Sequence, residues 1–287
     1  SRLIQGLWRM ADWHRSSQEI LSFIHQCLDL GITTFDHADI YGNYTCEGLF
    51  GEALKLDPSL RSRIQLISKC GIKLISDKHP NHKIKYYDTG YHHILDSVEN
   101  SLRLLHTDYL DVLLIHRPDP FMNADETAKA FTKLKQSGKV LHFGVSNFLP
   151  HQLELLASRL DFPLVTNQLE ISVMQLAAFT DGTLDQCQRL RMVPMAWSPL
   201  GGGELFRGDS PKAVRLRQTL TAIAQPFDAT IDQIAFAWLL AHPANIFPIL
   251  GTGNLERIRA AAAAETIPLP REQWFSIWIA STGCEVP

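Results

Sequence analysis

Four side chains that together could protonate a carbonyl oxygen stand at Asp36, Tyr41, Lys69 and His116. A tyrosine hydroxyl has a pKa of about 10, so it is a weak acid at neutral pH. A nearby lysine ammonium favours the phenolate, which lowers the pKa of the tyrosine and makes it a better proton donor. A carboxylate can keep that ammonium charged, and an imidazole can orient the carbonyl. The set therefore predicts proton donation as hydride reaches a carbonyl carbon, and a cofactor must supply the hydride.

The four side chains lie at the ends of short apolar runs that have the pattern of buried β-strands. The runs are Thr33–Asp36, Ile64–Ser68 and Asp111–Ile115, and Lys69 and His116 directly follow the second and third. An α/β barrel builds its active site from residues at the carboxyl ends of successive strands. The spacing therefore predicts that these side chains meet at one end of a barrel.

Strand and helix signals alternate along most of the chain. Capping residues precede several predicted helices, at Ser16 with Glu19, at Asn123, and at Thr230 with Gln233. Between the strand before Lys69 and the next helix we expect a polar loop, from Gly71 to about Gly90. The eight predicted strands are Leu3–Ile4, a run ending at Asp36, Ile64–Ser68, a run ending at Ile115, Val140–Val145, Leu164–Thr166, Val193–Ala196 and Phe247–Leu250.

This alternation favours a closed (β/α)8 TIM barrel, an α/β fold, over an open doubly wound sheet. An open sheet that binds a dinucleotide would usually carry Gly-x-Gly-x-x-Gly after its first strand, and the sequence lacks that motif. No Pro/Gly/Ser-rich linker divides the chain, so we expect residues 1–287 to form a single barrel domain.

The composition of the chain limits which partners the protein could bind and in which compartment we expect it. The net charge of −3 gives no basic field for nucleic acid, and the sequence has no long apolar stretch for a membrane. We see no signal peptide, and five cysteines without Cys-x-x-Cys spacing indicate reduced thiols, so we expect a cytoplasmic protein. The region of His82, His92 and His93 lacks metal-ligand spacing, and we expect no metal site.

Taken in order, these motifs resemble the aldo-keto reductase family, in particular a bacterial oxidoreductase branch of it. The Asp-x4-Tyr pair of the family resembles Asp36 and Tyr41, its lysine resembles Lys69 in Ile-Ser-Lys, and its histidine resembles His116 in Leu-Leu-Ile-His-Arg-Pro-Asp. The resemblance implies that Asp36, Tyr41, Lys69 and His116 are catalytic. It also implies NADPH-dependent reduction of a small aldehyde or ketone to an alcohol, with Tyr41 as general acid, by a monomer.

The resemblance extends to the residues that would bind the cofactor. Many family members carry a lysine where Gly251 stands, and the Glu-Asn pair often found near the adenine is Ala260-Ala261 here. Arg257 remains where the family binds the 2′-phosphate, so NADPH is favoured and NADH stays possible. Trp197 either stacks on the nicotinamide ring or packs in the core. The implied cofactor-binding residues are Ser146, Asn147, Gln168, Trp197, Ser198, Leu200, Gly251, Thr252, Gly253 and Arg257.

Two other functions and one ambiguous residue remain open. A barrel hydrolase could use Asp36 and Glu170 as a carboxylate pair, but it would leave Lys69 without a role. A catalytically weak NADP(H)-binding sensor on the same barrel would keep the cofactor residues and would not need the catalytic set. Trp8 either packs in the core or lines the substrate pocket.

Overall fold

The computed structural model describes residues 1–286, and Pro287, the last residue of the predicted domain, lies outside the described residues. Eight parallel strands close into a barrel, with helices between successive strands along the chain, so the predicted (β/α)8 fold is confirmed. The barrel strands are β1 (Ile4–Gly6), β2 (Thr34–Asp36), β3 (Gln65–Cys70), β6 (Leu110–Ile115), β7 (Val140–Ser146), β8 (Leu164–Glu170), β9 (Val193–Trp197) and β10 (Phe247–Leu250).

Helix starts follow local capping chemistry where the sequence offers it. Ser16 and Glu19 form the predicted capping box of α1, and Asn123 Oδ1 accepts hydrogen bonds from the first turn of α5. The helices are α1 (Ser17–Asp29), α2 (Tyr41–Tyr44), α3 (Cys46–Leu54), α4 (Tyr91–Leu105), α5 (Ala124–Gln136), α6 (Pro150–Ala157), α7 (Thr183–Leu190), α8 (Glu204–Arg207), α9 (Pro211–Ala224), α10 (Ile231–Leu240), α11 (Leu255–Ala263) and α12 (Arg271–Thr282).

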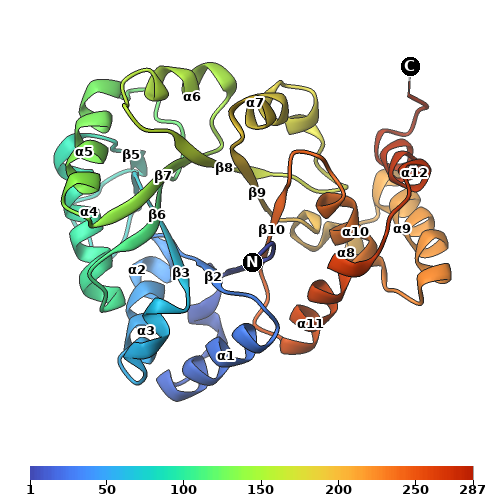
Figure 1. Cartoon of the computed structure of the whole chain (residues 1–287), viewed down its shortest axis with the longest axis horizontal. Coiled ribbons are helices and arrows are strands. Elements are labelled where there is room, and N and C mark those ends of the chain that lie inside the picture. Colours follow the sequence, from blue (N-terminus) through green and yellow to red (C-terminus); the bar gives the residue numbers. More distant parts are fainter. Residues whose placement is uncertain (287) are drawn as a thin grey trace. The chain divides into compact units, whose positions relative to one another are not determined.

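The chain forms two compact units. The first unit comprises Leu3–Asn167 together with Ser1 and Gly251–Gly253, and the second contains Arg2, Gln168–Leu250 and the chain from Asn254 onward. In the first unit β2, β3 and β6 lie side by side (Figure 1) and pair in parallel.

Register within the first unit sets the spacing of its strand ends. Asp36 on β2 pairs with Ile67 on β3, and Lys69 on β3 pairs with Leu114 on β6. Alternate residues of a strand point to opposite faces. Lys69 therefore projects on the same face as Ile67, and Ser68 projects on the other face, toward the helices.

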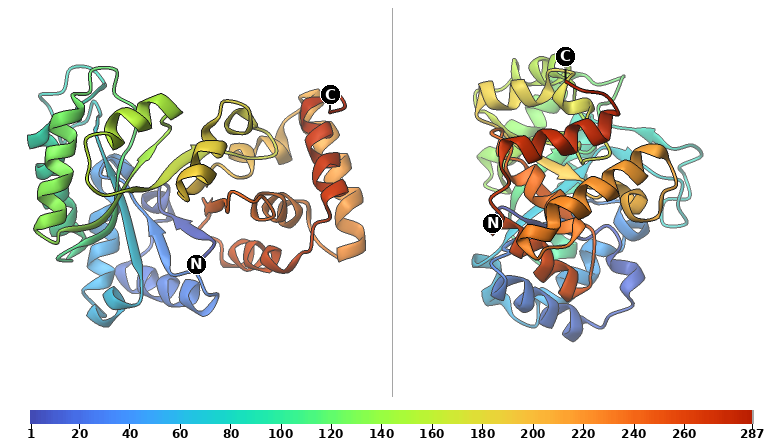
Figure 2. Two further views of the ribbon diagram at one scale, coloured as in Figure 1. Left: turned by 45° about the horizontal axis from the view of Figure 1, so that its top comes forward. Right: turned by 90° about the vertical axis from the view of Figure 1, so that its right-hand side faces the viewer.

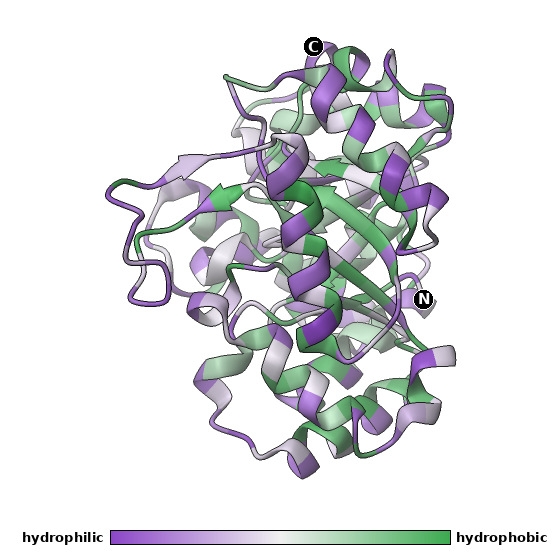
Figure 3. Cartoon of the chain, turned by 90° about the vertical axis from the view of Figure 1, so that its left-hand side faces the viewer, coloured by the Kyte–Doolittle hydropathy of each residue, from purple (hydrophilic) through white to green (hydrophobic). Residues whose placement is uncertain are grey.

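The segment predicted as a polar loop contains a β-hairpin instead. β4 (Ile72–Lys73) pairs antiparallel with β5 (Tyr86–Tyr87), and a connection over residues 74–85 joins them. Figure 3 shows the two short strands and a connection drawn largely as hydrophilic. Only two residues pair on each side, which is too short for a period-2 pattern to stand out in the sequence.

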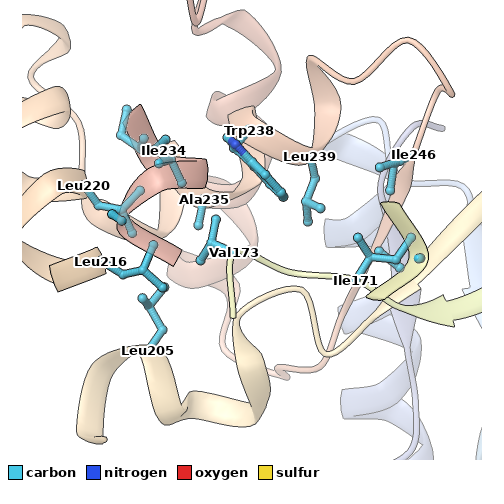
Figure 4. Packing of buried hydrophobic residues seen from close by; sticks show 14 of the residues in the cluster. Ile171, Val173, Leu205, Leu216, Leu220, Ile234, Ala235, Trp238, Leu239 and Ile246 are labelled. Atoms are coloured by element: carbon cyan, nitrogen blue, oxygen red, sulfur yellow. The ribbon is translucent and has the colours of Figure 1, made fainter. Parts of the chain in front are cut away.

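The second unit has a large apolar core of its own. Trp238 stacks on Trp274 with ring centroids 4.8 Å apart, and each indole N–H donates to the other residue's carbonyl oxygen at 3.0 Å. Figure 4 shows Trp238 and Leu239 of α10 packed among side chains from several segments. In both views of Figure 2, α9 and α12 run alongside each other. Within the described chain, no helix is both long and apolar enough to span a membrane.

Candidate active site

The ammonium group of Lys69 is the centre of the candidate site. Its Nζ donates hydrogen bonds to Asp36 Oδ2 at 2.8 Å, to the carbonyl oxygen of His37 at 2.6 Å, and to Tyr41 Oη at 3.0 Å. The side chain of Lys69 is fully buried, and that of Asp36 is 3% exposed. An ammonium has three N–H donors, so all of them are used. Lys69 is therefore held in one position with a single carboxylate as its ion-pair partner.

The imidazole of His116 also lies next to the tyrosine. The rings of Tyr41 and His116 are 5.9 Å apart between centroids and meet edge to face at 77°. His116 directly follows β6, and its backbone N–H donates to the carbonyl oxygen of Cys70 at 2.9 Å. The structure thus brings Asp36, Tyr41, Lys69 and His116 together, as the strand-end spacing predicts. Their catalytic roles stay predictions.

The hydroxyl of Tyr41 is protonated at neutral pH. Burial raises the pKa of Tyr41 above its ordinary value, and the Lys69 ammonium opposes this only in part. The charge of Lys69 lowers the pKa of Tyr41, as expected from the sequence. The expectation that the net pKa is lowered is wrong for this structure, because the effect of burial is larger. A neutral phenol beside a lysine can donate its proton and then leave a stabilised phenolate.

The charge states of Lys69 and His116 complement this proton donor. Burial lowers the pKa of Lys69, but Asp36 and Tyr41 together outweigh it, so the net pKa is raised and the ammonium persists. Burial, followed by the charges of Lys69 and Arg117, holds the pKa of His116 well below its ordinary value. The ring of His116 is therefore neutral at neutral pH. Its buried Nδ1 has no hydrogen-bond partner among residues 1–286.

The turn that carries Tyr41 has an unusual backbone. α2 is not a regular helix, because Gly42, Asn43 and Tyr44 all have left-handed conformations, with φ of 57°, 53° and 63°. A Cβ at Gly42 would lie 2.7 Å from Cys46 Sγ, so only glycine fits there. Left-handed backbone costs an L-residue roughly 1–2 kcal/mol, least for asparagine. Tyr44, a bulky residue, is therefore the strained position of this turn.

A buried acidic network lies behind the strand that carries Lys69. Glu47 on α3 accepts hydrogen bonds from Ser68 Oγ at 2.6 Å and from Ser101 Oγ at 3.0 Å. Asp39 accepts a hydrogen bond from Ser97 Oγ at 2.9 Å, one turn earlier on α4. All five side chains are at most 8% exposed. Sequence reasoning missed this network, because each bond joins residues at least 21 positions apart.

Burial raises the pKa of both acids of this network. Burial, with the charge of Glu47 as the next cause, raises the pKa of Asp39 to about 8. Burial also raises the pKa of Glu47, against the hydrogen bonds from Ser68 and Ser101. Asp36 therefore stands apart from them as the acid that pairs directly with Lys69.

Within the first unit, the expected cofactor residues are the last residue of a strand, the residue that follows it, and three residues of a loop. Ser146 is the last residue of β7, and Asn147 follows it in a left-handed conformation with φ of 62°. The Asn147 side-chain amide donates to Ser146 Oγ at 2.8 Å. A Cβ at Gly251 would meet nothing within 4 Å, so its backbone borders open space. Gln5 Nε2 donates to the carbonyl oxygen of Thr252 at 3.0 Å.

Gly253, the third residue of that loop, has a specific packing role. A Cβ there would lie 2.6 Å from the indole of Trp13, and Arg15 Nη2 donates to the Gly253 carbonyl oxygen at 2.7 Å. The close approach explains why this position needs glycine, and it fixes the path of the loop.

The other expected cofactor residues belong to the second unit. Gln168 is buried on β8, and Trp197 is the half-buried last residue of β9. Ser198 follows Trp197 in a left-handed conformation with φ of 49°, as Asn147 follows β7. Leu200 packs against the apolar core of this unit. A polar residue held left-handed directly after a strand is typical of functional sites.

Arg257, the remaining expected cofactor residue, lies in the first turn of α11. Asn254 caps this helix through a hydrogen bond from the Arg257 N–H at 3.2 Å. The side chain of Arg257 is exposed and makes no ion pair with any described residue. A free guanidinium fits a phosphate group, and so does the open backbone at Gly251. Each of these two groups is therefore suited, by itself, to contact a phosphate of a nucleotide cofactor.

Trp8 does not pack in the core. It follows β1 and is 62% exposed, with the guanidinium of Arg9 5.1 Å from its ring centroid. Its role in a substrate pocket stays a prediction. Across residues 1–286, no three histidine, cysteine, aspartate or glutamate side chains lie close enough to hold a metal ion.

Comparison with known proteins identifies relatives along nearly the whole chain. The model of the Aldo/keto reductase family matches residues 2–280. Uncharacterized oxidoreductase YcsN of Bacillus subtilis is 52% identical over 288 residues, covering 100% of this chain and 96% of that protein. A 6-dehydroglucose reductase of Agrobacterium fabrum is 47% identical, covering 100% and 96% respectively. A crystal structure of an aldo/keto reductase from Klebsiella pneumoniae, in complex with NADP and acetate, is 28% identical with a TM-score of 0.78 and covers 96% of this chain and 89% of that one.

Proposed function

Because the chain belongs to the aldo/keto reductase family, and is therefore an NAD(P)H-dependent oxidoreductase, we propose that it reduces a small aldehyde or ketone to an alcohol with NADPH. The observation that carries this proposal is the 3.0 Å hydrogen bond from buried Lys69 to Tyr41. Protonation of a carbonyl needs three groups that this site has. They are the protonated phenol of Tyr41, the charged ammonium of Lys69 beside it, and the neutral imidazole of His116 next to it.

The proposed mechanism assigns one task to each side chain. Bound NADPH supplies the hydride that adds to the carbonyl carbon. Tyr41 Oη donates its proton to the carbonyl oxygen, so the product is a neutral alcohol and the tyrosine becomes a phenolate. Lys69 stabilises that phenolate until solvent returns the proton, and Asp36 keeps Lys69 in place. The neutral ring of His116 donates one N–H to the carbonyl oxygen and orients it toward Tyr41.

We assign cofactor binding to residues near the carboxyl ends of β7, β8, β9 and β10, or just after them. Ser146, Asn147 and Gln168 would bind the nicotinamide carboxamide, and Trp197 would stack on its ring. Arg257 would bind the 2′-phosphate and so favour NADPH over NADH. The NADP complex of the relative from Klebsiella supports this choice of cofactor. The backbone at Gly251, Thr252 and Gly253, with Ser198 and Leu200, would contact the phosphates.

A sugar that carries an aldehyde is the first substrate to test. The Agrobacterium relative, 47% identical, is a 6-dehydroglucose reductase. The exposed indole of Trp8, two residues after β1, would give the pocket a flat face for a sugar ring. We also propose that the chain forms a single barrel domain and works as a monomer. A panel of aldehydes and ketones, run with NADPH and with NADH in parallel, tests the substrate and the cofactor together.

Replacing Tyr41 by phenylalanine tests the general acid. Tyr41→Phe keeps the ring and removes the proton donor, so we expect kcat for carbonyl reduction to fall by roughly 10²–10⁴-fold, the usual contribution of a positioned acid. The Kd for NADPH should stay within a factor of about two, because the hydroxyl is not proposed to bind the cofactor. Stopped-flow kinetics and fluorescence titration give the two values. Reduction at close to the wild-type rate would remove Tyr41 from the mechanism, and loss of NADPH binding would reassign it to the cofactor site.

A further inference from the structure

We propose that the β4–β5 hairpin is a positioning clamp for Tyr41, and that Tyr44 is the residue through which it acts. The hairpin comprises β4, β5 and the connection over residues 74–85. This inference rests on the proposed role of Tyr41 as general acid. It adds a function for Tyr44, Asp77 and His79, none of which touches the reacting atoms.

The clamp acts at the end of the turn, where Asn43 and Tyr44 receive little support from the turn itself. Asn43 and Tyr44 are left-handed, at φ of 53° and 63°. The bonds within the turn involve other groups: the Tyr41 N–H donates to the Ala38 carbonyl oxygen at 3.1 Å, the Thr45 N–H to that of Tyr41 at 3.1 Å, and Thr45 Oγ1 to that of Gly42 at 2.6 Å. At Tyr44 itself the turn supplies one longer bond, from its N–H to the Ile40 carbonyl oxygen at 3.3 Å, and it supplies none to the side chains of Asn43 and Tyr44. A strained backbone persists only when the surrounding structure fixes it.

The hairpin makes hydrogen bonds to the two strained residues themselves. Asn43 Nδ2 donates to Asp77 Oδ1 at 2.9 Å, and the backbone N–H of Leu74 donates to Tyr44 Oη at 3.0 Å. Lys78 Nζ donates to the carbonyl oxygen of Tyr44 at 3.3 Å. Tyr44 is therefore held at both its backbone and its side chain by residues that lie 30 or more positions further along the chain.

A column of four aromatic rings joins the turn to the base of the hairpin. The ring of Tyr44 lies 4.4 Å from that of His79, which stacks on His82 at 5.0 Å and 7°. The ring of His82 in turn meets Tyr86 of β5 edge to face at 5.8 Å. Nδ1–H of His82 donates to the carbonyl oxygen of Leu74 at 2.9 Å, which fixes the column to the hairpin.

The clamp affects catalysis because Tyr41 and Tyr44 belong to the same turn. Tyr41 begins the turn that Tyr44 ends, and the Tyr41 hydroxyl must stay 3.0 Å from Lys69 Nζ. If Tyr44 leaves the left-handed conformation, the backbone at Tyr41 rotates and the phenol moves away from the lysine. The hairpin therefore controls kcat through the position of the proton donor.

Two variants at one position separate clamping from any other role of Tyr44. Tyr44→Ala removes the ring and keeps the strain, whereas Tyr44→Gly removes the ring and the strain together. We expect Tyr44→Ala to lower kcat by roughly tenfold, the ratio that the cost of left-handed backbone implies, with Kd for NADPH unchanged. Tyr44→Gly should recover most of that loss. Equal kcat in the two variants, or a lower kcat in the glycine variant, would overturn the proposal.

A readout independent of activity uses the hairpin side of the clamp. His79→Ala should speed hydrogen exchange of the amides at residues 42–45 and lower kcat, whereas Ile84→Ala should do neither. Ile84 is 67% exposed on the same connection and serves as the matched control. Unchanged exchange in His79→Ala would overturn the clamp. If Tyr41→Phe proves fully active, the proposed function fails, but the exchange result still decides whether the hairpin fixes this turn.

Discussion

The ion pair between Lys69 and Asp36 is buried on both sides, so each partner depends on the other. Removing one member of a buried ion pair typically costs about 3–5 kcal/mol of folding free energy, because the remaining charge has no counterion. Removing both members costs much less. Stability and catalysis can therefore be separated at this pair by comparing single and double variants.

We expect Lys69→Met to be strongly destabilised and inactive, and Asp36→Asn/Lys69→Met to regain most of the folding free energy. In the double variant the pKa of Tyr41 should rise further, because Lys69 lowers it more than Asp36 raises it. Reduction needs the protonated phenol, so the alkaline limb of the kcat profile should move to higher pH, at a much reduced rate. Urea denaturation and pH–rate profiles measure the two effects. An alkaline limb that stays in place would show that Lys69 does not set the pKa of Tyr41.

Arg257 offers a test of cofactor preference at a single residue. Charge-assisted hydrogen bonds contribute about 1.5–3 kcal/mol each, so Arg257→Leu should raise the Kd for NADPH by roughly tenfold to a few hundredfold. The Kd for NADH should barely change, since NADH lacks the 2′-phosphate. Arg259→Leu is the matched control, because Arg259 is also exposed on α11 and pairs with Glu256 at 3.9 Å. Equal losses for the two nucleotides would place Arg257 on a group that they share.

Among the elements, those with local signals could be predicted from the sequence. The capping box at Ser16 and the cap at Asn123 each act within three residues, so the sequence marks the starts of α1 and α5. α9 also begins with a local signal, because Ser210 accepts a bond from the Ala213 N–H, but we do not identify this helix from the sequence. α12 has no side-chain cap and buries Ile277 and Ala280 against distant residues, so its pattern gives little indication of a helix.

The candidate site also has features that the sequence could predict and features that it could not. Strand ends placed Asp36, Lys69 and His116 correctly, because a barrel brings the carboxyl ends of its strands together. The sequence could not show that a backbone carbonyl, that of His37, holds Lys69, nor that a hairpin holds the turn at Tyr44. Both depend on backbone conformation and on contacts between segments distant in sequence, which side-chain types do not encode.

Helix α4 ties this site to the packing of the surrounding helices. A Cβ at Gly51 of α3 would lie 1.9 Å from the Leu104 carbonyl oxygen, so α3 and α4 approach through glycine. That close packing places Ser101 within 3.0 Å of Glu47 and keeps water from both. The strand that carries Lys69 is therefore fixed from behind by a dry polar layer.

For the whole molecule, buried histidines and buried acids have opposite effects on stability as pH changes. Burial lowers the pKa of His37 to about 3 and, with Lys73, that of His93 to about 4. A histidine with a lowered pKa contributes stability above its unfolded pKa, about 6.5, and this is lost as pH falls. Asp39, with a pKa raised to about 8, contributes stability below its unfolded pKa that is lost as pH rises to 8. Between about pH 7 and 8, the titration of Asp39 therefore changes the free energy of unfolding, and that of these two histidines does not.

Asp39→Asn should abolish a decline in stability that the wild type shows above neutral pH. At pH 7 the folded protein holds a proton on Asp39 that the unfolded chain has released, so unfolding free energy should fall by about 1 kcal/mol per pH unit as pH rises toward 8. Asparagine keeps the oxygen that accepts the bond from Ser97 and cannot titrate, so the variant should be flat over this range. Below about pH 6 the variant should lose stability more steeply than the wild type, because Asp39 no longer offsets the histidines. Asp161→Asn, at an exposed carboxylate of the first unit, should keep the wild-type slope. Urea denaturation at half-unit steps from pH 5 to 8.5 gives all three curves, and parallel curves for wild type and Asp39→Asn would mean that Asp39 is already ionised in the folded protein.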